Sequence, residues 1–348
     1  MSYTARASNS AFMYQLAAAC EQAGTLQVLQ GHTVASLTDL HALYKRRLCV
    51  NEYGSTSAYA LSHIHPVRGH DSIGTFHAAN LVLAPSVWNR LHGTKHFGHG
   101  LSIPRSQLQS RHDVHKGSSR KETITRIIRY LGEDVISEFA KAVKLQPTQR
   151  HRTLAWLYDH LDPTIPEHAE HLDGLDAMSS KALSTLKAKL QGKEGGEFRL
   201  IGREASLFDI FAEELTRFAA IRPDLAPLAG FIQECSVRIN HRESVITESE
   251  LLPLLFDLLH GKELGEVLPD LLPELACMKI LGKIALPVPS LTKLNQTATI
   301  IPVAQAPARV LATLMGFAES LDDPVLDVVP VMPRVRQEVV VNPLPWER

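Results

Sequence analysis

The helical pattern of this chain stops near residue 49 and does not return until about residue 119. Residues 11–23 and 36–48 carry apolar side chains at the three- and four-residue spacing of amphipathic helices. Between residues 49 and 100 this spacing disappears, while glycine and histidine become frequent. The interruption excludes a uniform helical bundle. We therefore expect a mainly α protein whose N-terminal part includes a small α+β module.

The interruption itself has the pattern strand, loop, strand, helix. Residues 59–67 read as a strand, residues 70–79 as a loop, and residues 80–84 as a second, short apolar strand. A short helix is expected over 87–92, with Gly93 ending it. This order predicts a ββα unit.

Four regions follow from the changes in composition. We expect N-terminal helices over residues 1–48, with a loose polar start, and the ββα unit with a basic connection over 49–117. A helical domain is expected over 118–285, and a proline-rich segment over 286–348.

Helix signals within the C-terminal half differ in strength. The apolar spacing is clearest over residues 203–220, and Ser119 with Glu122 forms a capping-box pattern for an earlier helix. Nine prolines fall between Pro287 and Pro345, around one further expected helix over 306–321. That segment reads either as extended straps on the helical domain or as a tail that binds a protein partner.

The overall composition is that of an ordinary globular protein. Hydrophobic residues make up 45% of the 348 residues, charged residues 21%, and the net charge is −1. No run of 18 apolar residues occurs, so no membrane association is expected, and we expect a cytoplasmic location. The four cysteines are far apart, which favours buried free thiols over disulfides or a zinc site: Cys20, Cys49, Cys235 and Cys277.

The ββα unit contains three short segments that share an ordered set of histidine and asparagine side chains. They are Leu61-Ser62-His63-Ile64-His65-Pro66-Val67, Asn80-Leu81-Val82-Leu83-Ala84-Pro85 and Asn89-Arg90-Leu91-His92-Gly93. Their order and spacing resemble the HNH, or His-metal finger, endonuclease family in its His-Asn-Asn variant. The resemblance covers roughly residues 58–95.

The resemblance implies a role for each of these side chains. His63 would be the general base that takes a proton from the attacking water, because a neutral imidazole suits that step near pH 7. Asn80 would hold the loop that orients His63. Asn89 would supply an oxygen ligand to Mg²⁺ or Mn²⁺, the hard cation that neutralises charge on the phosphate, and no organic cofactor is implied.

Ser62 is a departure from the family pattern. Many HNH members have an aspartate there as a second metal ligand, and serine is a weaker, uncharged ligand. His65 would share the face of His63 and replace that ligand only if the strand stays regular. An inactive finger that is kept as a DNA-binding module is therefore an open alternative.

A basic stretch adjoins this motif. Residues 90–130 hold nine Lys or Arg against two acidic residues, a net charge of +7, and also five histidines. We expect some of these side chains to bind DNA phosphates, against the alternative of a merely solvated face: Arg90, His92, Lys95, Arg105, Arg111, Lys116, Arg120 and Lys121. The pairs His96/His99 and His112/His115 have metal-like spacing, with a structural zinc as the minor alternative.

Three functions from different classes remain open. The first is a metal-dependent endonuclease acting on DNA, where duplex cleavage by one site per chain would favour a homodimer. The second is a catalytically inactive DNA-binding or regulatory protein, and the resemblance makes a phage, mobile-element or defence setting plausible for both. The third is a protein-interaction module that uses the helical domain and the proline-rich segment. No phosphate-loop, dinucleotide, zincin or hydrolase-elbow motif occurs.

Overall fold

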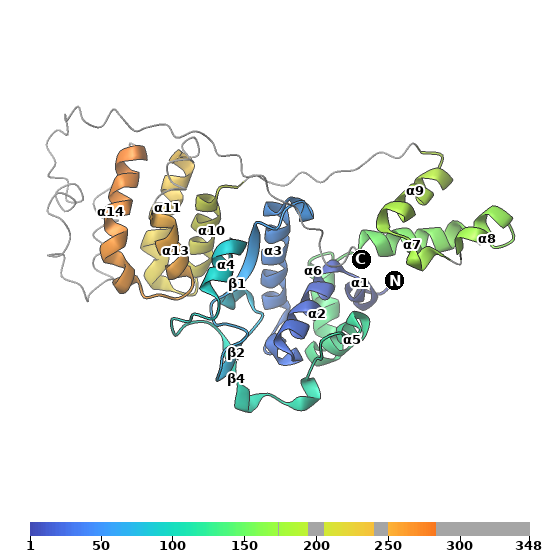
Figure 1. Ribbon diagram of the computed structural model, residues 1–348, viewed down its shortest axis with the longest axis horizontal. Helices are drawn as coiled ribbons and strands as arrows, with labels where there is room; N and C mark the ends of the chain where they lie inside the picture. Colours follow the sequence, from blue (N-terminus) through green and yellow to red (C-terminus); the bar gives the residue numbers. More distant parts are fainter. Residues whose placement is uncertain (173, 194–204, 240–249, 283–348) are drawn as a thin grey trace.

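The computed structural model describes residues 1–172, 174–193, 205–239 and 250–282, which are mainly helical with a small antiparallel β part (Figure 1). The N-terminal half contains α1 (Tyr3–Ser8), α2 (Ala11–Ala23), α3 (Val34–Val50), β1 (Tyr59–His63), β2 (Ser72–Gly74), β3 (Leu81–Pro85), α4 (Ser86–His92), β4 (Ser102–Pro104), α5 (Arg120–Leu131) and α6 (Glu133–Ala142). Later helices are α7 (Gln149–His160), α8 (Pro166–Leu172), α9 (Ser180–Leu190), α10 (Leu207–Ala219), α11 (Ala226–Ile239), α13 (Leu251–Leu259) and α14 (Leu264–Gly282). The helix expected over 306–321 and the proline-rich segment lie outside the described residues.

The first helices form one packing unit with α5 and α6. Helix α1 packs against α6, α2 against α5, and α3 against α6, with the Phe12 and Phe139 rings 5.4 Å apart in the shared core. The predicted boundary at residue 118 therefore does not separate α5 and α6 from the N-terminal helices. The expectation of a loose start was wrong as well: Ser2 caps α1 and Ala7 is fully buried.

Two small antiparallel sheets lie in the region where the helical pattern stops. Strand β1 pairs with β3 in the register Leu61 to Leu83 and His63 to Leu81, and α4 follows β3 directly. Strand β2 pairs with β4. The segment expected to be only a loop, residues 70–79, therefore contains a three-residue strand.

Helices α10, α11, α13 and α14 lie on the other side of the strands from the N-terminal helices (Figure 1). Helix α10 covers the open edge of β3, where Glu214 accepts a hydrogen bond from the Leu83 amide and Arg217 donates one to the Leu81 carbonyl. These side chains satisfy strand groups that β1 does not pair.

Helices α7, α8 and α9 surround a second core of their own. This core contains five buried leucines: Leu157, Leu161, Leu175, Leu183 and Leu186. The described helices of the domain predicted for 118–285 are thus divided between two hydrophobic cores, because apolar periodicity identifies helices but not their partners.

Capping signals in the sequence predict the helix starts only in part. Ser206 caps α10, but Ser119, the first residue of the capping-box pattern, makes no side-chain capping bond to α5. Helix α4 begins at Ser86 and has no side-chain cap either. Cys20 is buried and Cys49 half-buried, both as free thiols. Within the described ranges, no helix is long and apolar enough to cross a lipid bilayer.

Candidate functional site

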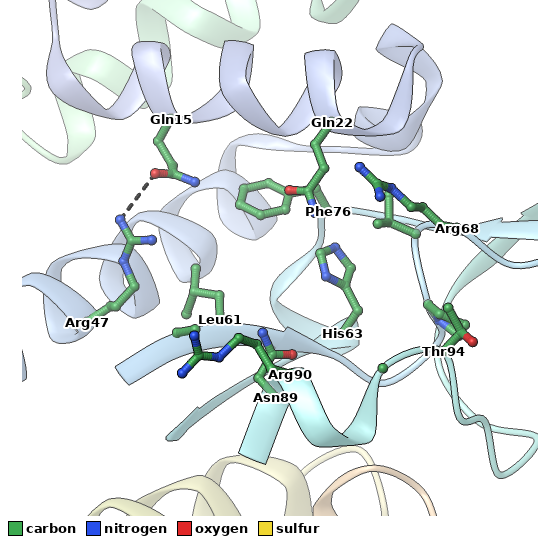
Figure 2. A pocket seen from close by; sticks show the side chains of 14 residues that line it. Gln15, Gln22, Arg47, Leu61, His63, Arg68, Phe76, Asn89, Arg90 and Thr94 are labelled. Carbon is green, nitrogen blue, oxygen red and sulfur yellow. Dashed lines mark hydrogen bonds between the residues drawn. The ribbon is translucent and has the colours of Figure 1, made fainter. Parts of the chain in front are cut away.

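A cleft of about 540 Å³ opens between the N-terminal helices and the β1–α4 unit. Figure 2 shows Gln15 and Gln22 on the α2 side, with His63 of β1 and Asn89 of α4 across from them. The cleft therefore brings together the two side chains that the sequence resemblance made central.

His63 is the last residue of β1 and is half-buried in the cleft wall. Its ring lies 6.0 Å from the Phe76 ring, centroid to centroid. Burial lowers the pKa of His63 to about 4, so the imidazole is neutral at pH 7. Within the described part of the chain neither ring nitrogen takes part in a hydrogen bond, which leaves one of them free to accept a proton.

Helix α4 is fixed on the side away from the cleft. The Trp88 ring lies 5.9 Å from the Phe211 ring and 5.6 Å from the Phe256 ring. The next residue, Asn89, and the exposed Arg90 line the cleft. Aromatic packing by one residue therefore orients its neighbours toward the cleft.

Asn80 braces the backbone that follows His63. Its fully buried side chain accepts hydrogen bonds from the amides of His65 and Leu101, at 2.9 and 3.2 Å, and donates to the carbonyls of His65 and Thr75, at 3.2 and 2.9 Å. These bonds use all four hydrogen-bonding positions of the amide. Asn80 thus holds the backbone segment after His63, as expected. Its role in orienting His63 for catalysis is a proposal.

Two of the predicted metal ligands do not reach the cleft. Ser62 points to the opposite face of β1, where it is 1% exposed and its Oγ lies 2.7 Å from Nε2 of His260. The strand alternation that directs His63 into the cleft necessarily turns Ser62 away. His65 lies beyond the end of β1, and its ring nitrogens bond to His96 Nε2 at 2.8 Å and Ser72 Oγ at 2.8 Å. The expectation that either residue joins Asn89 as a ligand in this cleft is contradicted by this geometry.

His92 also lies elsewhere than predicted. It is 7% exposed and packs toward α13, with its ring 5.4 Å from Phe256 and 4.5 Å from His260. Burial lowers its pKa, which the nearby Asp257 partly offsets. His92 therefore belongs to the interior between α4 and α13, and the expectation of a phosphate contact there was wrong.

The remaining predicted nucleic-acid ligands are exposed but lie outside the cleft. They share the basic connection and the start of α5: Lys95, Arg105, Arg111, Lys116, Arg120 and Lys121. Arg105 donates to the Gly69 carbonyl, and the Arg111 carbonyl accepts from Arg126. Their guanidinium and ammonium groups form no ion pair among the described residues, so they remain available to an anionic partner.

Four glutamines and arginines of the cleft were missed by the sequence reasoning. Gln15 and Gln22 of α2 and Arg47 of α3 come from helices outside the 58–95 segment, and Arg68 follows β1. Only Arg68, close to the motif and basic, carried a usable signal. The helical residues enter the cleft through tertiary packing.

The described part of the chain contains no cluster of three or more His, Cys, Asp or Glu side chains that could hold a metal ion. His96 bonds to His65 and to the His99 carbonyl, and His99 pairs with Glu263 at 2.6 Å. Comparisons with protein-family models, with curated proteins and with solved structures find no significant match. The functional argument therefore depends on the chemistry of the cleft.

Proposed function

We propose that this chain is a divalent-metal-dependent endonuclease of the HNH kind that hydrolyses phosphodiester bonds in DNA. The observation that supports this most directly is the cleft shared by His63 and Asn89, reached through the order β1, β3, α4. A neutral imidazole beside an amide oxygen, in a cleft lined by arginines, has the groups that phosphodiester hydrolysis needs.

His63 would act as the general base. It takes a proton from a water molecule as the water oxygen bonds to phosphorus; the opposite P–O bond breaks, and the leaving oxygen is protonated from solvent. A phosphate bound beside the imidazole would raise its pKa from about 4 toward the range where a base works best. Arg68 and Arg90 lie on the cleft wall to hold that phosphate.

The described cleft lining offers a divalent cation only neutral oxygen donors, such as Asn89, Gln22 and Thr94, so the ion would need the substrate phosphate to complete its ligands. Ser62 and His65 are directed elsewhere. Mg²⁺ commonly keeps several waters and binds through few protein oxygens together with substrate phosphate. When bound, such an ion would neutralise charge on the phosphate and on the leaving oxygen.

The decisive experiment is cleavage of supercoiled plasmid with Mg²⁺, with Mn²⁺, and with EDTA. We expect metal-dependent nicking that His63→Ala reduces at least a hundredfold while DNA binding persists, because general-base catalysis contributes on that order. His70→Ala is the matched control. His70 follows His63 in the segment after β1, but its side chain is 96% exposed and lies outside the cleft. Equal nicking by the wild type and His63→Ala would refute the assignment.

A second function is favoured by one specific observation. Because neither Ser62 nor His65 supports Asn89, the cleft offers a poor ligand set to a metal without substrate. A non-catalytic DNA-binding protein would shift labelled DNA with a steep salt dependence and never nick it. In that case Arg111→Glu with Lys116→Glu should weaken binding, whereas His63→Ala should not.

A further inference from the structure

Arg46 and Arg47 are adjacent on α3, but only Arg46 has carboxylate partners among the described residues. Arg46 pairs with Glu213 at 2.6 Å and with the buried Glu214 at 2.7 Å. Arg47 points toward the cleft (Figure 2), and its Nη2 donates to Gln15 Oε1 at 3.1 Å. One arginine is neutralised by carboxylates and the other is held by a neutral amide.

The environment of Arg47 fixes its side chain without balancing its charge. Its guanidinium carbon lies 5.5 Å from the centroid of the Tyr44 ring. Its Nε is buried and has no hydrogen-bond partner within the described ranges. Among the residues the structure describes, no carboxylate lies within ion-pair distance of it. A half-buried cation without a counter-ion costs free energy, which an anion from outside the chain would offset.

The rest of the cleft has the same sign of charge. Arg68 and Arg90 also line it, while Asp and Glu are absent from its described lining. In Figure 2, Arg47 and Arg68 lie on opposite sides of His63. A nucleic-acid strand that presents one phosphate to His63 would present the next phosphates on either side.

We propose that Arg47 binds a backbone phosphate that flanks the one at His63, with Gln15 and Tyr44 holding its guanidinium in place. This inference rests on the proposed function for the position of the scissile phosphate. The phosphate contact itself does not require cleavage. Arg47 is thus a substrate-binding residue contributed by α3, outside the segment that carries the family resemblance.

The test measures binding of a fluorescein-labelled single-stranded DNA oligonucleotide to the full chain with His63→Ala, over a series of salt concentrations. Arg47→Gln should weaken binding and reduce the slope of log K against log salt by about 0.7, the loss of one phosphate contact. Arg47→Lys should keep the slope, because it keeps the charge. Arg6→Gln is the matched control, since Arg6 also lies over a tyrosine ring, at 5.2 Å, but outside the cleft.

Methylphosphonate substitution, one phosphate at a time, then locates the contact. At one position the neutral linkage should weaken DNA binding by the protein that keeps Arg47. The same linkage should not weaken binding by Arg47→Gln any further. Thermal unfolding of each variant identifies any that has lost its fold. Unchanged salt slope in folded Arg47→Gln, or additive losses at every position, would overturn the phosphate contact.

The two proposals can fail separately. Coupling at one phosphate without any plasmid nicking by the wild type would support this contact and refute the nuclease. Nicking that depends on His63, with no coupling to Arg47, would support the nuclease and refute this contact.

Discussion

Replacing Glu214 by glutamine should destabilise the chain far more than the same change at Glu213. Both carboxylates pair with Arg46, at 2.7 and 2.6 Å. The Glu214 side chain is 0% exposed, and it also accepts from Arg217 at 2.5 Å and from the Leu83 amide at 3.3 Å. The Glu213 side chain is 45% exposed. Comparing the two glutamine variants therefore separates the effect of burial from the effect of losing a charge.

The magnitude follows from what each change leaves behind. Glu214→Gln removes the charge that compensates two partly buried arginines and turns an amide N–H₂ toward groups that can only donate. Breaking a buried ion pair costs about 3–5 kcal/mol. Glu213→Gln removes a largely solvent-screened pair, for which we expect less than about 1 kcal/mol.

Urea denaturation followed by Trp88 fluorescence measures this difference, because Trp88 packs against α10 and α13. Trp156 and Trp346 are first replaced by phenylalanine. At a urea dependence of about 3 kcal/mol per molar, a loss of this size should lower the midpoint of Glu214→Gln by about 1 M or more. Equal midpoints for the two glutamine variants would refute the argument that the buried carboxylate holds β3 to α10.

Two further predictions concern the framework of the cleft. His260 is fully buried and burial lowers its pKa to about 3, so the stability that is present above pH 6.5 should be lost as the pH falls toward 3. In urea titrations at pH 7.5 and pH 5, the wild type should lose about 2 kcal/mol more stability between the two pH values than His260→Gln. Equal losses would contradict this prediction. A Cβ on Gly100 would lie 2.4 Å from Asn80 Oδ1 and 2.7 Å from the His65 amide, whereas Gly98 has open space and a similarly positive φ. Gly100→Ala should therefore lower the unfolding temperature, and the proposed nuclease activity, well below those of Gly98→Ala. Indistinguishable variants would show that the hydrogen bonds of Asn80 tolerate displacement of its side chain.

The elements nearest the cleft were predictable because their signals are local. Two short apolar strands and a helix ended by Gly93 follow from residues within a few positions of one another, and the structure contains β1, β3 and α4 there. The pairing of β2 with β4 was not predictable in the same way. Each strand has three residues, which is too short for an alternation pattern to show.

The predictions of Ser62 and His65 as metal ligands failed because strand alternation was applied without knowing the core side of β1, and beyond the end of that strand. Alternation correctly separates His63 from Ser62 only once the direction of the core is known, and His65 lies beyond the point where β1 ends. His92 was expected to bind a flanking phosphate because it lies at the end of the short helix with Arg90 and Lys95. Its buried position depends on His260, which is 168 residues away.

The ββα unit is therefore not a separable module, although the resemblance covers only about 35 residues. Each of its three elements is held by a later helix: β1 through Ser62 and His260, β3 through the Leu83 amide and Glu214, and α4 through Trp88 and the aromatic rings of α10 and α13. On the opposite side, α2 and α3 supply the far wall of the cleft. Since the orientation of His63 and Asn89 depends on both supports, any chemistry in the cleft belongs to the whole arrangement of helices around it.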